Sequence, residues 1–85
     1  MSDFRVAVHI IPRRGILDPQ GKAVGDALRT LGFKGIGDVH VGRHIVLDVQ
    51  ASTADPARAS AGDMCRKLLA NPVTEDFEIA GVSAL

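Results

Sequence analysis

Histidines, one cysteine and a group of carboxylates are the side chains in this sequence that could support catalysis or metal binding. His9, His40 and His44 could be combined into a metal site, but no carboxylate or cysteine stands at ligand spacing beside them. Because zinc sites usually take three or four such ligands, histidines exposed on a sheet surface are the better interpretation. We expect no metal in this chain.

Cys65 and the acidic segment near the C-terminus provide neither a nucleophile nor an acid–base pair. Cys65 has no base near it in the sequence and falls on the apolar stripe of a predicted helix, as a small core residue does. Glu75, Asp76 and Glu78 would need a pocket and a perturbed pKa to act as general acid and base. A solvated acidic segment is the simpler interpretation, so we expect no catalytic residue.

The stretch from Gly15 to Gly21 is the most informative in the chain. Asp18-Pro19 is typical of a helix start, because an N-cap aspartate accepts a hydrogen bond from the first turn and proline at N1 lacks an amide that would stay unpaired. Arg13 and Arg14 beside this helix start could hold an anion, although Asp18 already occupies the cap. An ordinary basic loop is the preferred interpretation of these two arginines.

This stretch also contains more than a helix start requires. Gly21 stands where alanine would be a better helix former, and Ile16 and Leu17 are apolar in a connection expected to be exposed. A second Asp-Pro pair at 55–56 lacks these additions. We therefore predict that the turn docks on another subunit, with Gly21 allowing close approach. The predicted interface comprises Arg14, Ile16, Leu17, Asp18, Pro19, Gln20, Gly21 and Arg43.

Length and composition indicate a single domain, residues 1–85, with no affinity for nucleic acid. The chain has ten basic and ten acidic residues, a formal net charge of zero, and neither Trp nor Tyr for stacking on bases. The only cysteine is Cys65, so no intrachain disulfide is possible. Without a signal-peptide pattern or a long apolar run, we expect a soluble cytoplasmic protein that does not bind membranes.

Apolar periodicity predicts the order β-α-β-β-α-β. Residues 4–11 alternate as a strand, and residues 77–82 form the last strand. The core face of the first strand comprises Phe4, Val6, Val8 and Ile10. A helix over 19–31 carries a stripe of Ala23, Val24, Ala27, Leu28 and Leu31 and ends at Gly32. The second helix begins with Asp55-Pro56 as its cap and ends before Asn71-Pro72. Its stripe comprises Ala57, Ala61, Met64, Cys65, Leu68 and Leu69.

The central residues 39–49 allow two interpretations. A tight hairpin led by Gly42 is favoured, and one long strand bent by a bulge at Gly42 is the alternative. The resulting α+β fold is a two-layer, four-stranded antiparallel sheet with both helices on one face. Ala7, Ile11 and Val46 would lie on the open face, so we expect the chain to oligomerise through the sheet as a dimer or a dimer of dimers.

Four parts of the sequence resemble the small S subunits (PurS) of phosphoribosylformylglycinamidine synthase, in the family's order. Residues 17–24, Leu-Asp-Pro-Gln-Gly-Lys-Ala-Val, resemble the family signature. Residues 27–28 with 31–33 resemble the end of the first helix, and residues 38–39 with 41–43 resemble the central strand. Residues 64–73 and 75–77 resemble the second helix and the last strand. Three positions differ from the family pattern: Gly25, expected to be exposed on the first helix, His40 and Thr74.

The resemblance implies a subunit of an ATP-dependent amidoligase of purine biosynthesis. That complex converts formylglycinamide ribonucleotide, ATP, glutamine and water to formylglycinamidine ribonucleotide (FGAM), ADP, phosphate and glutamate. A large synthase subunit uses ATP and magnesium, and a glutaminase subunit releases ammonia. The small subunit has no catalytic residue and no cofactor of its own; it joins the other two and supports ammonia transfer. The alternative is a ferredoxin-like regulatory module that senses a small molecule.

Overall fold

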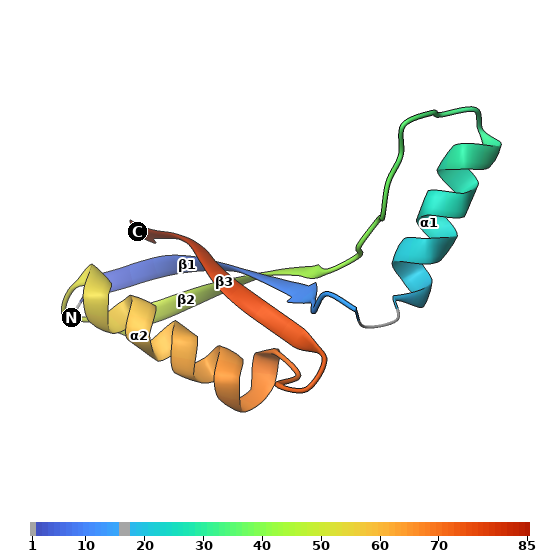
Figure 1. Cartoon of the computed structure of the whole chain (residues 1–85). Helices are drawn as coiled ribbons and strands as arrows, with labels where there is room; N and C mark the ends of the chain where they lie inside the picture. The colour runs from blue at the N-terminus through green and yellow to red at the C-terminus, as the bar shows by residue number, and fades with distance from the viewer. Residues whose placement is uncertain (1, 16–17) are drawn as a thin grey trace.

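The computed structural model describes residues 2–15 and 18–85 and contains one antiparallel sheet and two α-helices (Figure 1). The elements are β1 (Ser2–Pro12), α1 (Pro19–Thr30), β2 (Arg43–Ala51), α2 (Ala54–Met64), the π-helical turn η1 (Cys65–Leu69) and β3 (Glu75–Ala84). The predicted first and last strands and both helices are confirmed. In the described part of the chain, no helix is long and apolar enough to cross a membrane.

Strand β1 is the centre of the fold, because it pairs with both other strands in the order β2-β1-β3. Its side chains alternate, and Val6, Val8 and Ile10 are fully buried, which confirms the predicted core face. The small residues Ala57 and Ala61 of α2 are also fully buried, so this helix comes close to the sheet. The core is therefore a thin layer between one helix and one sheet.

The last turn of the second helix differs from its predicted stripe. The amide of Ala70 donates to the carbonyl of Cys65 at 2.9 Å, a five-residue spacing typical of a π-turn. This wider turn keeps Cys65 buried and leaves Leu68 83% exposed, so the prediction that Leu68 faces the core is wrong. Met64, 36% exposed, also lies outside the buried set.

The second helix does not begin with an Asp-Pro cap. Thr53 is its N-cap, and Asp55 and Pro56 lie within the first turn. Proline is tolerated there because first-turn amides have no partner within the helix. The prediction that both helices use the same cap is therefore wrong.

The predicted four-stranded sheet with two helices on one face is also wrong, since the described residues form three strands. Residues 36–42 do not fold back on β2 as a hairpin; they run away from the sheet in an extended path (Figure 1). The bent-strand alternative is nearer, although only the part from Arg43 onward joins the sheet. Helix α1 lies beyond the end of the sheet, so α2 alone covers a sheet face, and the molecule extends 51 × 26 × 14 Å.

The opposite face of the sheet is open, as predicted. Ile11 and Val46 are 49% and 50% exposed, among polar residues such as the Arg5–Asp48 ion pair, whose closest N–O distance is 3.0 Å. Oligomerisation through this face stays a prediction.

Candidate functional site

The most unusual part of the molecule is an arm formed by residues 18–42, which comprises α1 and the extended segment that returns to β2. It projects from the sheet, and its two halves lie side by side (Figure 1). Because α1 has little contact with the sheet, contacts inside the arm must hold it together. These contacts form the framework of the candidate docking site.

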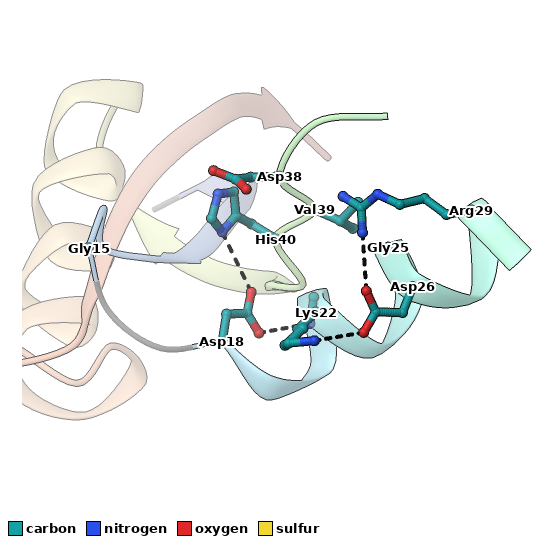
Figure 2. A pocket seen from close by; sticks show the side chains of 10 residues that line it. Gly15, Asp18, Lys22, Gly25, Asp26, Arg29, Asp38, Val39 and His40 are labelled. Carbon is teal, nitrogen blue, oxygen red and sulfur yellow. Dashed lines mark hydrogen bonds and ion pairs between the residues drawn. The ribbon is translucent and has the colours of Figure 1, made fainter. Parts of the chain in front are cut away.

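Asp18 joins the two halves of the arm. Its Oδ1 accepts a hydrogen bond from the amide of Gly21 at 2.9 Å, which confirms the predicted N-cap. Its Oδ2 accepts a second bond from the amide of Val41 at 3.0 Å, 23 residues along the chain. His40 stands beside it, with Nδ1 3.7 Å from Oδ2 (Figure 2).

These hydrogen bonds stabilise the charged form of Asp18. The bond from the Gly21 amide, followed by that from Val41, holds the pKa of this carboxyl below its usual range. Asp18 is therefore ionised at neutral pH, and its two oxygens bind separate parts of the arm.

Gly21 and Gly25 let the returning segment touch the backbone of α1. Both are buried, and a Cβ on Gly21 would collide with the carbonyl oxygen of Val39. A Cβ on Gly25 would lie 3.3 Å from a Val39 methyl group. The expectation that Gly25 is exposed is wrong, and the close approach at Gly21 is explained by this chain's own Val39.

A polar hollow of about 620 Å³ lies between α1 and the returning segment (Figure 2). Lys22 and Arg29 on its wall both contact Asp26, at 2.8 and 3.2 Å, and the Lys22 ammonium lowers the pKa of Asp26. Arg29 also donates to the carbonyl oxygen of Gly37 at 2.9 Å. Lys22, Asp26 and Arg29 thus pair with one another, and Arg29 connects α1 to the returning segment.

The apolar stripe of α1 is largely exposed to solvent. Val24 is 43% exposed and Leu31 73%, and Phe33 just after the helix is 58% exposed. Leu28 alone in the predicted stripe is half-buried. The helix boundaries were predicted correctly. The prediction that this stripe is buried in the chain's own core is wrong.

The structure divides the predicted interface residues into two groups. Arg14, Pro19 and Gln20 are exposed, the last two in the first turn of α1, whereas Asp18 and Gly21 make contacts within the arm. Arg43 donates to the carbonyl oxygen of Leu69 at 2.7 Å and to Glu75 at 2.8 Å, so it ties β2 to the end of η1. Ile16 and Leu17 lie outside the described residues.

The other candidate groups have structural roles. His9 and His44 are cross-strand neighbours with ring centroids 4.9 Å apart, while His40 belongs to the arm. In the part of the chain described here, no three metal-ligating side chains cluster. Cys65 is fully buried, and this burial raises the pKa of its thiol, so it is a core residue.

Acidic residues of β3 also make surface contacts with the β1 side of the sheet. Asp76 pairs with Arg13, just after β1, at 3.1 Å, and the carboxylate of Glu78 lies 3.4 Å from Nδ1 of His9, its cross-strand partner. With Arg13 paired and Asp18 in the cap, the basic-loop interpretation of Arg13 and Arg14 is favoured over an anion site.

Sequence reasoning missed Gly25, Arg29 and Val39 as parts of the site. One signal could have indicated them: Gly21 and Gly25 are four residues apart, so they lie on the same face of a helix. Two glycines on one face mark a place where another backbone can approach.

Asp18→Asn is expected to separate the two functions of this side chain. The amide oxygen can still cap Gly21, but the NH₂ group cannot accept a bond from Val41. The Val41 amide should therefore exchange with solvent at least about tenfold faster (one tenfold step per 1.4 kcal/mol), while helix content stays unchanged. Hydrogen exchange followed by NMR tests this, and equal acceleration at Gly21 and Val41 would contradict the separation.

The hydrogen bond from the Val41 amide to Asp18 also has a defined pH dependence in the native chain. Because the pKa of Asp18 is lower in the folded chain, its stabilisation is fully present above the ordinary carboxyl pKa of about 4. It is lost only as the pH falls through the lowered value. Val41 protection, corrected for intrinsic exchange, should stay constant from about pH 7 to about pH 5, a window above the pKa values concerned.

Comparisons with known proteins agree with the architecture of the arm and the sheet. Residues 5–83 match the family model "PurS: Phosphoribosylformylglycinamidine (FGAM) synthase". Phosphoribosylformylglycinamidine synthase subunit PurS of Mycobacterium leprae is 41% identical over 75 residues, which cover 88% of this chain and 91% of the relative.

Solved structures match over the whole fold. The structure of Thermus thermophilus PurS has a TM-score of 0.87 and 34% identity, covering 98% of both chains. A chain in the structure of PurLQS from Thermotoga maritima has a TM-score of 0.83 and 29% identity, covering 100% of both. This chain therefore belongs to the PurS family of phosphoribosylformylglycinamidine synthase subunits.

Proposed function

We propose that this subunit of FGAM synthase joins the large synthase subunit and the glutaminase subunit and supports the transfer of ammonia between them. The observation that carries the proposal is the full-length match to a chain in the Thermotoga maritima PurLQS structure. In this proposal the small subunit takes no chemical step. ATP and magnesium are used by the large subunit.

The contacts of the candidate chemical groups support a non-catalytic role. The thiol of Cys65 is enclosed in the core, and the carboxylates of Glu75 and Asp76 are paired with arginines. Groups held in this way lack the accessible, activated geometry that nucleophilic or acid–base catalysis needs. The family match also favours this role over a small-molecule-sensing module.

The exposed start of α1 is the proposed contact with another subunit. Pro19 and Gln20 are exposed in the first turn of α1, beside a cap hydrogen bond that is already made, and Arg14 is exposed before it in the sequence. Docking there would cost little ordering of the backbone. Self-association, as a dimer or a dimer of dimers, is part of the same proposal.

Co-purification tests the proposed function. A tagged chain is mixed with the large and glutaminase subunits of the same source, with glutamine and nucleotide present, and the complex is sized by light scattering. We expect a complex of all three, weakened by Gln20→Ala and unchanged by Arg58→Ala on the exposed side of α2. The proposal would be contradicted if the native chain fails to bind the large subunit and the glutaminase subunit in one complex.

A further inference from the structure

A row of three titratable side chains crosses the open face of the sheet. His44 on β2 is the registered partner of His9 on β1, and His9 is the registered partner of Glu78 on β3. The ring centroids of the two histidines are 4.9 Å apart, and the Glu78 carboxylate lies 3.4 Å from Nδ1 of His9. The expectation of no metal rested on histidines that lack a carboxylate beside them in the sequence. The sheet supplies that carboxylate from a distant strand.

The composition of this row differs from that of its neighbours. The other charged groups on the open face form ion pairs of one arginine with one carboxylate, Arg5–Asp48 and Arg13–Asp76. The middle row has two imidazoles and a single carboxylate, which lies beside His9. Within residues 2–15 and 18–85, the side chain of His44 makes no hydrogen bond or ion pair, and its ring neighbour is His9. Cross-strand charge pairing therefore explains His9 and Glu78 but not His44.

The two imidazoles are placed so that both can present a nitrogen to one metal ion. A carboxylate near Nδ1 favours the tautomer of His9 that carries its proton there, which leaves the lone pair of Nε2 free. In a tetrahedral shell with Zn–N bonds of about 2.0–2.1 Å, two ligand nitrogens lie roughly 3.3 Å apart. Both rings are accessible to solvent, and their centroid separation of 4.9 Å allows that spacing by rotation of the side chains.

We propose that His9 and His44 bind a divalent transition metal of the zinc class across β1 and β2, with Glu78 orienting His9 from β3. A carboxylate behind a ligating histidine is the usual arrangement at such sites. Two imidazoles fill half of a tetrahedral shell and water fills the rest, so the bound metal is exchangeable. Imidazole nitrogen favours zinc, whereas magnesium requires oxygen ligands. This site is additional to the proposed joining role and does not depend on it.

Titration of the native full-length chain with Zn²⁺ alone tests the site. Calorimetry should give one bound Zn²⁺ per chain, and the NMR signals of the imidazoles should place it at His9 and His44. His44→Ala removes a ligand and should abolish this binding. His40→Gln is the matched control, because it removes the third imidazole of the chain, which stands in the arm. Its affinity for Zn²⁺ should equal that of the native chain.

Glu78→Gln tests the orienting role. It should weaken Zn²⁺ binding at least about tenfold, as the loss of an outer-shell partner does, and shift the nitrogen NMR signals of His9 toward the other tautomer. Asp76→Asn removes the same charge from the same strand, where Asp76 pairs with Arg13, and should change neither quantity. Equal weakening by both substitutions would indicate a general charge effect and overturn the role of Glu78.

The metal site as a whole is overturned by any of three results. These are no binding of Zn²⁺ by the native chain, equal losses in His40→Gln and His44→Ala, and binding of Mg²⁺ as tight as that of Zn²⁺. His44 is exposed, so its replacement should leave the circular dichroism spectrum unchanged. Since no other subunit is present, these results are independent of the co-purification that tests the proposed function.

Discussion

Gly21→Leu is expected to release the returning segment from α1 while the sheet stays folded. Any Cβ at this position would collide with the backbone of Val39, which cannot move away as a flexible side chain could. Within the helix alone the substitution should be favourable, because glycine is a poorer helix former than leucine by roughly 0.5–1 kcal/mol. The two effects have opposite signs, so the experiment separates them.

The measurement combines amide exchange with the mass of the native assembly. We expect protection at Val41 to fall by more than about tenfold, a loss of roughly 1.4 kcal/mol or more, and the mass of the native assembly shows whether self-association depends on the same contact. Circular dichroism should show at least native helix content. Gly37→Ala is the matched control in the same arm, since a Cβ there meets no described atom within 4 Å. Unchanged Val41 protection in Gly21→Leu would show that the close approach is unimportant.

The alternation of β1 allowed its core face to be predicted, because side chains on a strand alternate strictly between two faces. Val6, Val8 and Ile10 are buried as expected. The boundaries of α1 were equally accessible to prediction, since an N-cap aspartate and a terminal glycine act within one turn of the helix. Local rules succeed where local geometry decides the outcome.

The position of α1 could not be predicted in this way. Periodicity shows that Val24 and Leu31 share a face with the rest of the stripe, but it does not show what covers that face. The arm depends on a hydrogen bond between Asp18 and Val41 and on close packing between Gly21 and Val39, contacts between distant parts of the sequence. A hairpin at Gly42 satisfies the same sequence pattern, so the pattern alone could not exclude it.

The docking prediction for residues 15–21 was correct about a close approach but not about which backbone makes it. An unexpected glycine in the first turn correctly indicated a close backbone approach, but the neighbouring backbone belongs to the same chain. Pro19 serves the helix start, so exposed Gln20 is the part of the motif that takes part in none of the described contacts of the arm. It is the position at which substitution should affect partner binding more than stability.

Leaving this chain out of the reconstituted enzyme should have the largest effect on function. If the chain joins the glutaminase to the synthase, ammonia released from glutamine cannot be transferred efficiently without it. Ammonia added directly bypasses that step. We expect glutamine-dependent FGAM synthesis to fall at least about a hundredfold, equivalent to about 2.7 kcal/mol, and ammonia-dependent synthesis to change little. Adding the chain back should restore the glutamine-dependent rate.

The ratio of glutamine-dependent to ammonia-dependent synthesis, measured with and without the chain, is therefore the most direct test of its role as the joining subunit. The predicted result is a ratio that collapses on omission and recovers on addition of the native chain, but recovers only partly with Gln20→Ala. A ratio that is the same with and without the chain would contradict this role.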